Sequence, residues 1–230
     1  MLIIIDAQLP RQVIEKLSPH GTVFQLKSNQ LVYDSISGHP DIFIFQMENL
    51  VIIAPNSPKE LMAILKSHRI PYLKGKEKLG SKFPETAYYN ALCTSKYLIH
   101  RKGHSTGCIL KLNQTKKFIN VNQAYTRCNL LNLPDGSFIT SDQGIIKALQ
   151  EEGLETHYFS SEDILLNGHD HGFLPGAMGI FQDKVFIIGT LSAYREGERL
   201  KTLLESKSLD IIELYQGPLI DGGGIFFLNP

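Results

Sequence analysis

The sequence predicts an α/β fold in which five similar units, each of strand, strand, helix and strand, close into a ring. The same order of short apolar strands and one amphipathic helix recurs at a spacing of roughly 35–50 residues, which is typical of repeat architectures. The chain ends on a glycine run and one apolar strand, Asp221 to Pro230, without a later strand to pair with it. It begins on another apolar strand, Met1 to Ile5. Pairing of these two strands would complete one unit and close the ring.

The first helix is expected soon after the N-terminal strand. Apolar residues recur at helical spacing across Gln8–Ser18, and Pro10 is tolerated because it falls in the first turn. Pro19 and Gly21 end this helix, and Thr22–Leu26 resumes an extended pattern. These segments supply the helix and third strand of the unit that the two termini share.

The next unit opens at His39. Ile42–Phe45 and Leu50–Ala54 are predicted strands joined by a short turn. Ser57-Pro58-Lys59-Glu60 is typical of a helix start, with serine as the cap, proline in the first helical position and glutamate closing a capping box. Ile70–Leu73 is expected to be the closing strand.

The following unit has the weakest local pattern. Asn90–Cys93 and Tyr97–His100 are predicted to pair, and Phe118–Val121 is predicted to be the third strand. Its helix must lie within Gly103–Lys116, whose glycines and threonines have low helix propensity. The helix is expected here because the neighbouring units have one.

Two further units repeat the order with stronger signals. Pro134-Asp135-Gly136 indicates a hairpin turn, Asp142 and Ser192 are predicted helix caps, and Gly153 suits the left-handed position that ends a helix. Strands are expected at Asn129–Leu133, Phe138–Thr140 and Thr156–Phe159 in one unit, and at Met178–Phe181, Lys184–Gly189 and Ile211–Leu214 in the other.

The composition indicates a cytoplasmic globular protein with one domain over residues 1–230. Lys plus Arg and Asp plus Glu number 23 each, so no net charge favours nucleic acid or acidic membranes as partners. Cys93, Cys108 and Cys128 are odd in number and widely spaced, which fits neither a disulfide framework nor a metal site. No signal segment or membrane span is expected. The sequence predicts no cofactor and no metal.

Several segments resemble the pentein enzymes, which modify guanidino groups. Leu174–Gly189, L-P-G-A-M-G-I-F-Q-D-K-V-F-I-I-G, is similar to the glycine-led hairpin of that family, and Tyr125–Asn129, Y-T-R-C-N, resembles the arginine-aspartate opening of another repeat. The ending G-G-G-I-F-F-L-N resembles the terminus of agmatine deiminases. The resemblance implies a five-bladed pentein, an α/β propeller of ββαβ repeats whose first strands line a central channel.

The resemblance also implies a chemistry from which this sequence departs. In the pentein enzymes a cysteine thiolate of the last unit attacks the guanidinium carbon, a histidine protonates the leaving nitrogen and carboxylates hold the cation. The position matching that cysteine lies near Phe227, so the usual nucleophile is absent. Arg127 is followed by Cys128 where the family has aspartate. The chain is therefore interpreted as an uncharacterised branch with this fold.

Cys128 is the predicted nucleophile, because the adjacent Arg127 would stabilise its thiolate. The alternative is a small buried apolar side chain at a strand start. His171 and His39 are the predicted acid and base; the alternatives are a solvated loop for the His169-Asp170-His171 segment and a strand cap for His39.

The remaining candidates would bind a ligand in the channel by charge or hydrogen bonds. Asp221 would hold a cation, and its alternative is a turn aspartate that bonds nearby backbone amides. The predicted ligand-binding residues are Asp41, Asn90, Arg127, Asn129, His169 and Asp221.

Two functions follow from these residues. The first is a cysteine-dependent hydrolase or amidinotransferase-like enzyme acting on a small guanidine, amidine or amide compound. The second is a non-enzymatic pentein that binds a small ligand or a protein. The expected partner is a small molecule bound in the central channel, with a protein partner or a homodimer as further possibilities.

Overall fold

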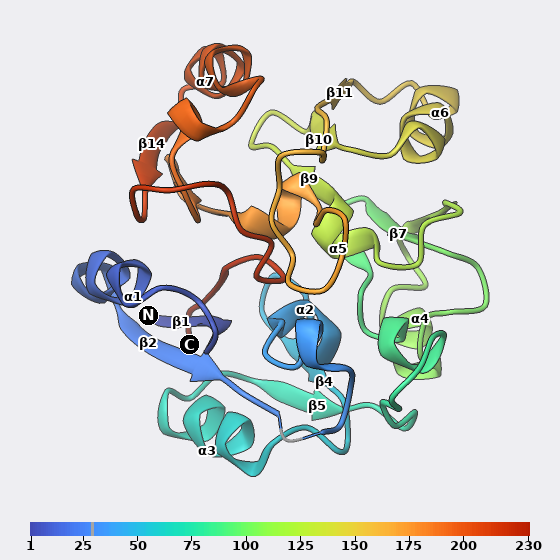
Figure 1. The fold of residues 1–230 in the computed structure, drawn as a ribbon. Coiled ribbons are helices and arrows are strands. Elements are labelled where there is room, and N and C mark those ends of the chain that lie inside the picture. The colour runs from blue at the N-terminus through green and yellow to red at the C-terminus, as the bar shows by residue number, and fades with distance from the viewer. Residues whose placement is uncertain (29) are drawn as a thin grey trace.

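Five small sheets stand around a common centre in the structure of this chain, a computed structural model that describes residues 1–28 and 30–230 (Figure 1). Each sheet has three strands, and its middle strand pairs antiparallel with one neighbour and parallel with the other. An outer helix connects the two parallel strands of each unit. The predicted α/β ring of ββαβ units is confirmed.

The strands match the predicted units to within two residues at each end. In spatial order the sheets are β15 (Phe226–Leu228), β1 (Leu2–Asp6) and β2 (Thr22–Leu26); β3 (Ile44–Gln46), β4 (Val51–Ile53) and β5 (Tyr72–Lys74); β6 (Leu92–Cys93), β7 (Tyr97–His100) and β8 (Lys117–Asn120); β9 (Leu130–Asn132), β10 (Phe138–Thr140) and β11 (Thr156–Tyr158); and β12 (Met178–Phe181), β13 (Lys184–Ile187) and β14 (Asp210–Glu213).

The two ends of the chain pair with each other. Strand β1 pairs antiparallel with β15, with Leu2 opposite Leu228 and Ile3 opposite Phe227, and it pairs parallel with β2. All five residues of β1 are buried. The markers for the two termini lie side by side in Figure 1. This pairing completes the unit that the sequence splits between its ends.

Five helices lie on the outside of the ring, each buried along one face. Leu61 and Leu65 of α3 are buried one helical turn apart, as are Ile145 and Leu149 of α6. The outer helices are α1 (Arg11–Leu17), α3 (Lys59–Ser67), α4 (Gly107–Leu112), α6 (Gln143–Glu151) and α7 (Gly197–Ser206). The apolar core therefore lies between each sheet and its helix.

A short helical turn precedes the first strand in several units, which corrects two predicted strand starts. Residues Pro40–Phe43 form α2 and Thr126–Asn129 form α5, so the strands begin at Ile44 and Leu130 and not at Ile42 and Asn129. A proline in the first helical position favours such a turn in α2. The shift matters because it places these turns, and not strands, next to the centre of the ring (Figure 1).

Short 3₁₀ turns occupy other connections of the ring. The turn η4 (Leu174–Ala177) leads into β12 in the same way that α2 leads into β3. The others are η1 (Ser18–His20), η2 (Asp34–Ile36), η3 (Glu85–Ala87) and η5 (Leu191–Ala193).

The unit with the weakest sequence pattern does contain a regular helix. Helix α4 spans Gly107–Leu112, and the hydroxyl of Thr106 accepts a hydrogen bond from the Ile109 amide at 3.4 Å. Ile109, within this helix, is fully buried. The helix is short because the glycine and threonine residues that precede it form its approach and its cap.

Of the predicted helix ends, the Asp142 cap and the left-handed Gly153, whose φ is 71°, are confirmed, and the Ser57 and Ser192 caps are wrong. Asp142 caps α6, with its carboxylate 2.9 Å from the Ile145 amide. Ser57 does not cap α3, which begins after Pro58 and has no side-chain cap. Ser192 lies within η5, and α7 starts only at Gly197. After Ser192 the backbone first completes the hydrogen bonds of the 3₁₀ turn η5, so the helix begins only at Gly197.

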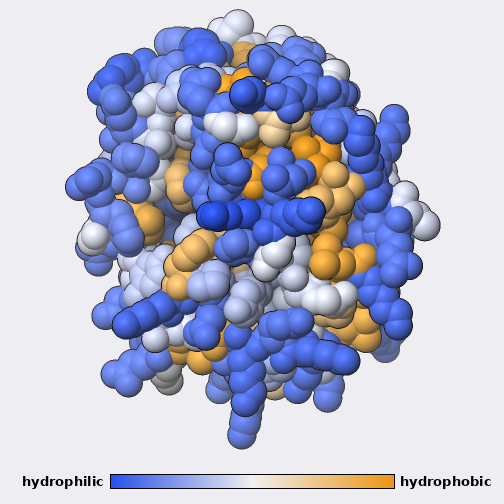
Figure 2. Space-filling model, turned by 90° about the vertical axis from the view of Figure 1, so that its right-hand side faces the viewer, coloured by the Kyte–Doolittle hydropathy of each residue, from blue (hydrophilic) through white to orange (hydrophobic). Residues whose placement is uncertain are grey.

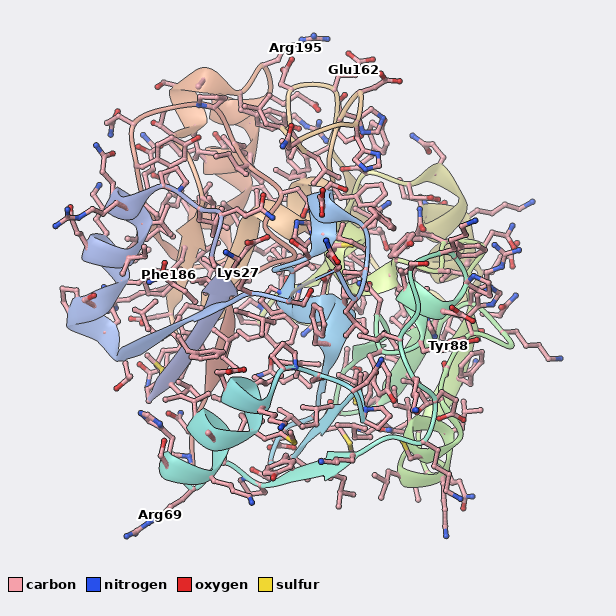
Figure 3. The ribbon with its side chains drawn as sticks, turned by 60° about the horizontal axis from the view of Figure 1, so that its bottom comes forward. Lys27, Arg69, Tyr88, Glu162, Phe186 and Arg195 are labelled. Carbon is pink, nitrogen blue, oxygen red and sulfur yellow. The ribbon has the colours of Figure 1, made fainter. Side chains whose placement is uncertain are left out.

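Polar side chains cover most of the face that carries α4 and α6 (Figure 2). On the side of α4 and α6, hydrophilic residues dominate and apolar residues show between them (Figure 2). Arg69 points away from the ring, and Glu162 and Arg195 form a peripheral ion pair at 2.9 Å (Figure 3). Exposed pairs of this kind contribute about 0–1 kcal/mol to stability. Within residues 1–28 and 30–230, no helix combines the length and apolarity that crossing a membrane requires.

The closing pair of strands gives a stability prediction. Leu2→Ala should lower the free energy of unfolding by about 2–5 kcal/mol, because Leu2 is fully buried and packs where the two termini meet. Leu112→Ala removes the same atoms from a side chain that is 41% exposed on α4, and it should cost less than about 1 kcal/mol. Urea unfolding of both variants measures the difference. Equal losses would contradict a rigid closing strand pair.

Candidate active site

Backbone segments from several units meet at the centre of the ring, and glycines allow them to approach. A Cβ atom added at Gly223 would lie 2.5 Å from Cβ of His39 and 2.6 Å from Oδ1 of Asp41. One added at Gly176 would lie 2.0 Å from Oδ1 of Asp221. Gly223 and Gly224 also have positive φ angles of 70° and 78°. The glycine run thus makes room for charged side chains at the centre.

Two connected hollows open at the end of the ring where the first strands begin. The inner hollow has a volume of about 150 Å³ and is lined by Cys128 together with three histidines and Asp221. The outer hollow has a volume of about 540 Å³ and contains Asp6 and Asp170. Both are lined by His39, Leu166, His169 and Asp221. These shared residues make the outer hollow an entrance to the inner one.

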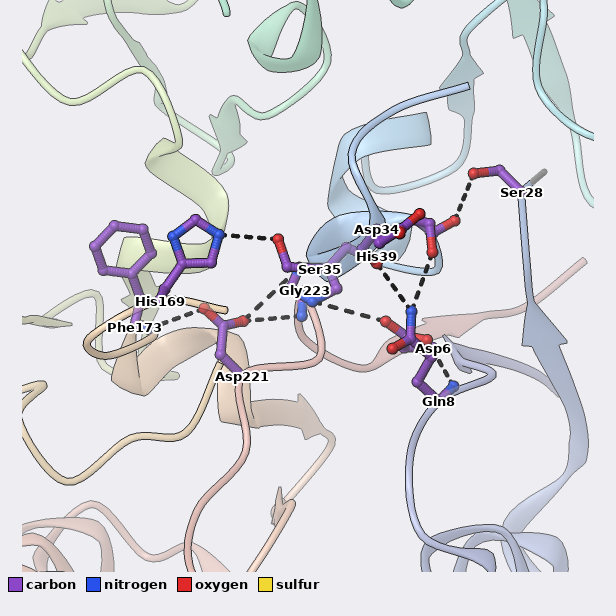
Figure 4. A network of polar contacts seen from close by, with 11 residues as sticks. Asp6, Gln8, Ser28, Asp34, Ser35, His39, His169, Phe173, Asp221 and Gly223 are labelled. Atoms are coloured by element: carbon purple, nitrogen blue, oxygen red, sulfur yellow. Dashed lines mark hydrogen bonds and ion pairs between the residues drawn. The ribbon is translucent and has the colours of Figure 1, made fainter. Parts of the chain in front are cut away.

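His39 lies between two buried carboxylates. Its Nε2 is 3.7 Å from Oδ2 of Asp6, and its Nδ1 is 4.0 Å from Oδ1 of Asp221 (Figure 4). The Asp221 carboxylate accepts hydrogen bonds from the amides of Phe173 at 2.9 Å and Gly223 at 3.0 Å. Burial lowers the pKa of His39 to about 3, so its imidazole is neutral at physiological pH.

The carboxylates of the site hold protons more tightly than exposed ones. Burial is the main cause in each case, because it disfavours the charged form. It raises the pKa of Asp6 to about 6 and the pKa of Asp41 to about 6. Burial, with the nearby charge of Asp41, raises the pKa of Asp221 to about 7. Near neutral pH this centre therefore shares protons among three acids.

Asp41 is the most isolated of these acids. It is fully buried on α2, and among the described residues neither oxygen of its carboxylate has a hydrogen-bond partner. Arg127 lowers the pKa of Asp41, yet burial outweighs this effect. A buried carboxylate without partners is costly, which is the usual mark of a functional position.

Cys128 does not have the stabilised thiolate that the sequence predicts. Burial, followed by the charges of Asp41 and Asp221, raises the pKa of the Cys128 thiol well above its ordinary value. Arg127 acts in the predicted direction but is outweighed. Adjacency in sequence identified the favourable charge, but it could not show the two carboxylates that the fold brings to the same place.

Arg127 lies beside the thiol but opens toward the other end of the ring. Its guanidinium carbon is 5.0 Å from the centre of the Phe226 ring, and its Nη1 has no hydrogen-bond partner within the described ranges. It lines a separate hollow with Gln46 and Lys116. Neighbouring residues of α5 thus face opposite ends of the channel.

Residues 4–226 match a family of unknown function, DUF6873. The chain belongs to the DUF6873 family. No curated protein matches it in sequence.

Among solved structures, this DUF6873 chain is similar to several enzymes with the pentein fold. An amidinotransferase from Microseira wollei, in the saxitoxin biosynthetic pathway, has 10% identity and a TM-score of 0.55 over 92% of this chain and 87% of its own. A DDAH from Pseudomonas aeruginosa, a cysteine-to-serine mutant complexed with citrulline, has 9% identity and a TM-score of 0.52 over 92% and 91%. The pentein fold is therefore confirmed.

A third similar structure holds a substrate. It is the N-terminal domain of a cyanobacterial arginine dihydrolase, with 11% identity and a TM-score of 0.57 over 92% of the DUF6873 chain and 90% of its own. At such low identity the likeness concerns the fold alone.

The structure brings most of the predicted site residues together. Cys128, His39, His169, His171 and Asp221 line the inner hollow. His169 also accepts or donates a hydrogen bond with the Ser35 hydroxyl at 2.9 Å, which ties its loop to η2 across the entrance (Figure 4). His171 contacts the Gly172 carbonyl at 2.9 Å.

The two predicted asparagines lie behind the site and not in its lining. Oδ1 of Asn90 accepts the Arg127 amide at 2.7 Å, and Nδ2 of Asn90 lies 3.9 Å from Sγ of Cys128. Oδ1 of Asn129 accepts the Ser141 amide at 3.1 Å. In this arrangement Asn90 positions α5 and Asn129 holds the start of β9.

Sequence reasoning missed Asp6 and two tyrosines. Asp6 directly follows the four apolar residues of β1, and a charged residue at the end of a buried strand was the available signal. Tyr33 and Tyr125 line the inner hollow, with their hydroxyls 3.1 Å apart. Tyr33 comes from a connection without periodicity. Tyr125 opens the Y-T-R-C-N segment, in which only Arg127, Cys128 and Asn129 were predicted site residues.

The acidic centre of this DUF6873 chain does not form a metal site within residues 1–28 and 30–230. In that part of the chain, no group of three or more His, Cys, Asp or Glu side chains is placed to hold a metal ion. The carboxylates instead face neutral His39 and backbone amides.

The raised pKa of Asp221 gives a pH prediction. The folded state keeps its proton up to about pH 7 while the unfolded state releases it near 3.8, so this contribution to stability is present at low pH and is lost as pH rises. Asp221→Asn removes the titration. The stability of the variant relative to wild type should therefore rise between pH 4 and 7 with a slope approaching about 1.4 kcal/mol per pH unit.

Asp183→Asn is the matched control for this measurement. The hydrogen bond from Lys184 lowers the pKa of Asp183, so its carboxylate is ionised in both states above pH 5. Urea unfolding from pH 5 to 7 should give a flat difference for this variant. If the difference in unfolding free energy between Asp221→Asn and wild type is also independent of pH, a protonated carboxyl at the centre is contradicted.

Proposed function

We propose that this protein is a thiol-dependent enzyme that hydrolyses or transfers the amidino group of a small guanidine or amidine compound. The arrangement of Cys128 carries the proposal, because its thiol shares one hollow with His39, His171 and Asp221. Nucleophile, acid-base group and cation-binding carboxylate are the set that this chemistry requires.

Binding of the substrate is the first step. A guanidinium or amidinium ion in the inner hollow would face Asp221, and a carboxylate can accept two parallel hydrogen bonds from such a planar cation. Asp41 is fully buried and does not line the hollow, so it would act on the cation through its charge alone. Asp221 is oriented for this role by the amides of Phe173 and Gly223. The cation would displace the protons that burial holds on these acids.

Activation of the thiol depends on the same carboxylates. The charge of Asp41 acts on the neighbouring Cys128 thiol, and burial raises the pKa of both groups. Asp41 can therefore accept the thiol proton while the bound cation compensates the new charge on sulfur. The enzyme would keep an inert thiol until a cationic substrate arrives.

The proposed reaction passes through an amidino group covalently linked to Cys128. The thiolate forms a carbon–sulfur bond with the central carbon, the bond to the leaving amine breaks, and a histidine protonates that amine. Water, or an acceptor amine in a transferase, attacks the thio-linked amidino group and releases the thiolate. His39 and His171 both line the hollow beside Cys128. His171 is the proposed acid, and His39, which is neutral, is the proposed base that takes the proton of the attacking water or amine.

The structural neighbours support this class of reaction by analogy. An amidinotransferase, an arginine dihydrolase and DDAH complexed with citrulline share the fold. This chain differs from the pentein pattern in taking the proposed nucleophile from α5 rather than from the strand that follows the glycine run.

A second candidate is a protein that binds a small ligand or a protein partner without turning a substrate over. One observation favours it: burial and two carboxylates raise the pKa of Cys128, so its thiol is unreactive without a ligand. Thiol labelling separates the two functions.

The test compares two alkylating probes of the same size. 2-Chloroacetamidine is a cation and 2-chloroacetamide is neutral, so carboxylates at the centre should favour the first. For each thiol, the ratio of its labelling rate with the amidine to its labelling rate with the amide is compared. We expect this ratio to be at least about tenfold larger for Cys128 than for a free thiol, which corresponds to about 1.4 kcal/mol of selective binding. Peptide mass spectrometry locates and times the adducts.

The preference should grow with pH and depend on the carboxylates. It should appear between pH 6 and 8, where Asp41 and Asp221 ionise from pKa values of about 6 and about 7. Asp221→Asn should reduce it, and Cys128→Ala should leave only slow labelling of Cys93 and Cys108. Equal labelling of the three cysteines, or no preference for the amidine, would reject the enzymatic proposal.

A further inference from the structure

A third hollow lies at the other end of the ring and plays no part in the chemistry proposed above. It has a volume of about 390 Å³, within the range of small-molecule sites. Its walls are the ends of first strands and the turns after them, including Gln46 to Glu48, Cys93 to Ser95 and Asn132. The active-site hollows lie where those strands begin, so this one is named the opposite hollow.

The two ends of the ring are lined by ionisable residues of opposite kind. The outer active-site hollow is lined by Asp6, Asp170 and Asp221, with neither lysine nor arginine among its described lining residues. The opposite hollow is lined by Lys116 and Arg127, with Glu48 as its acidic residue. Glu48 is exposed at the rim, whereas the two cations are half-buried.

Both cations have hydrogen-bond donors to spare. Lys116 Nζ donates to the carbonyls of Thr94 and Ser95, which leaves one of the three donors of an ammonium group. The guanidinium of Arg127 has five donors, and its buried Nη1 has no partner within residues 1–28 and 30–230. Burying such a group unpaired costs free energy that an acceptor would recover.

We propose that the opposite hollow binds a small organic anion, a carboxylate or a phosphate, between Lys116 and Arg127. Guanidinium and ammonium groups are the side chains that recognise both anions, arginine through two parallel hydrogen bonds and lysine as a point charge. The apolar side chains of Leu131 and Ile180 line the same hollow and suit the carbon skeleton of such a ligand.

Anion binding here would also regulate the thiol. Arg127 lines the opposite hollow, yet it is the residue before Cys128 and Asn90 contacts both: Oδ1 of Asn90 accepts the Arg127 amide at 2.7 Å, and its Nδ2 lies 3.9 Å from Sγ of Cys128. The charge of Arg127 lowers the pKa of Cys128 against the effect of burial. An anion paired with the guanidinium would offset that charge and make the thiol harder to ionise. This coupling rests on the proposed role of Cys128, whereas anion binding itself does not.

The first experiment measures binding by isothermal titration of succinate and of inorganic phosphate, as probes of the two anion chemistries. We expect at least one probe to bind with a dissociation constant in the range of about 0.1–10 mM, and Lys116→Gln to weaken it about tenfold. Succinate alone binding would identify a carboxylate site, and phosphate alone a phosphate site.

Lys117→Gln is the matched control. It removes the same charge from the next residue, but Lys117 lies outside the opposite hollow and its ammonium pairs with Glu152. It should change binding less than about twofold. Neither probe saturating below about 50 mM, or Lys116→Gln and Lys117→Gln behaving alike, would overturn the proposed site.

The second experiment separates this site from the active site. Titration of Cys128→Ala should give wild-type anion affinity, because the thiol does not line the opposite hollow. In wild type, saturating anion should slow labelling of Cys128 by 2-chloroacetamidine, and Lys116→Gln should remove that effect at the same anion concentration. Binding without slowed labelling would overturn the coupling and leave the anion site in place.

Discussion

Strand β15 follows the glycine run directly, so its register against β1 determines where Gly222–Gly224 and Asp221 lie at the centre of the ring. The same strand β1 ends in Asp6, the second carboxylate beside His39. One pairing between distant parts of the sequence therefore brings two of the three central acids to the same imidazole. A slip of one residue would turn every side chain of β15 to the other face of its sheet.

The cost of burying these acids is met in two ways. Protonation removes charge from Asp6, Asp41 and Asp221, whose pKa values lie at about 6 to 7, and Arg127 supplies a positive charge beside Asp41. Asp221 gains backbone amide partners as well, whereas the Asp41 carboxylate has none among the described residues. A centre of this kind is least stable as a dry, fully ionised cluster, and it is therefore suited to receive a cation.

The sequence was sufficient for the fold because each unit repeats the same local signals. Alternating strands, the Pro134-Asp135-Gly136 turn and the Asp142 cap agree with one architecture, and pairing of the ends follows from the half units. The site was harder to predict. Cys128 and Arg127 were found through their adjacency, but the pKa of the thiol is decided by Asp41 and Asp221, about ninety residues away on either side. Tyr33 comes from an irregular connection, and Tyr125 opens the Y-T-R-C-N segment, but nothing in the sequence indicates that these two tyrosines are neighbours in space.

The closing pair of strands also has a consequence for the order in which the protein is made. During synthesis strand β1 is made before the four inner units, whereas its antiparallel partner β15 and the glycine run are made after them. Until then β1 has an unpaired edge, and the hollow around Cys128 lacks Asp221. A nascent chain can therefore form its inner units before it can bind a ligand at the centre, and a ligand can stabilise the ring only once β15 has paired with β1.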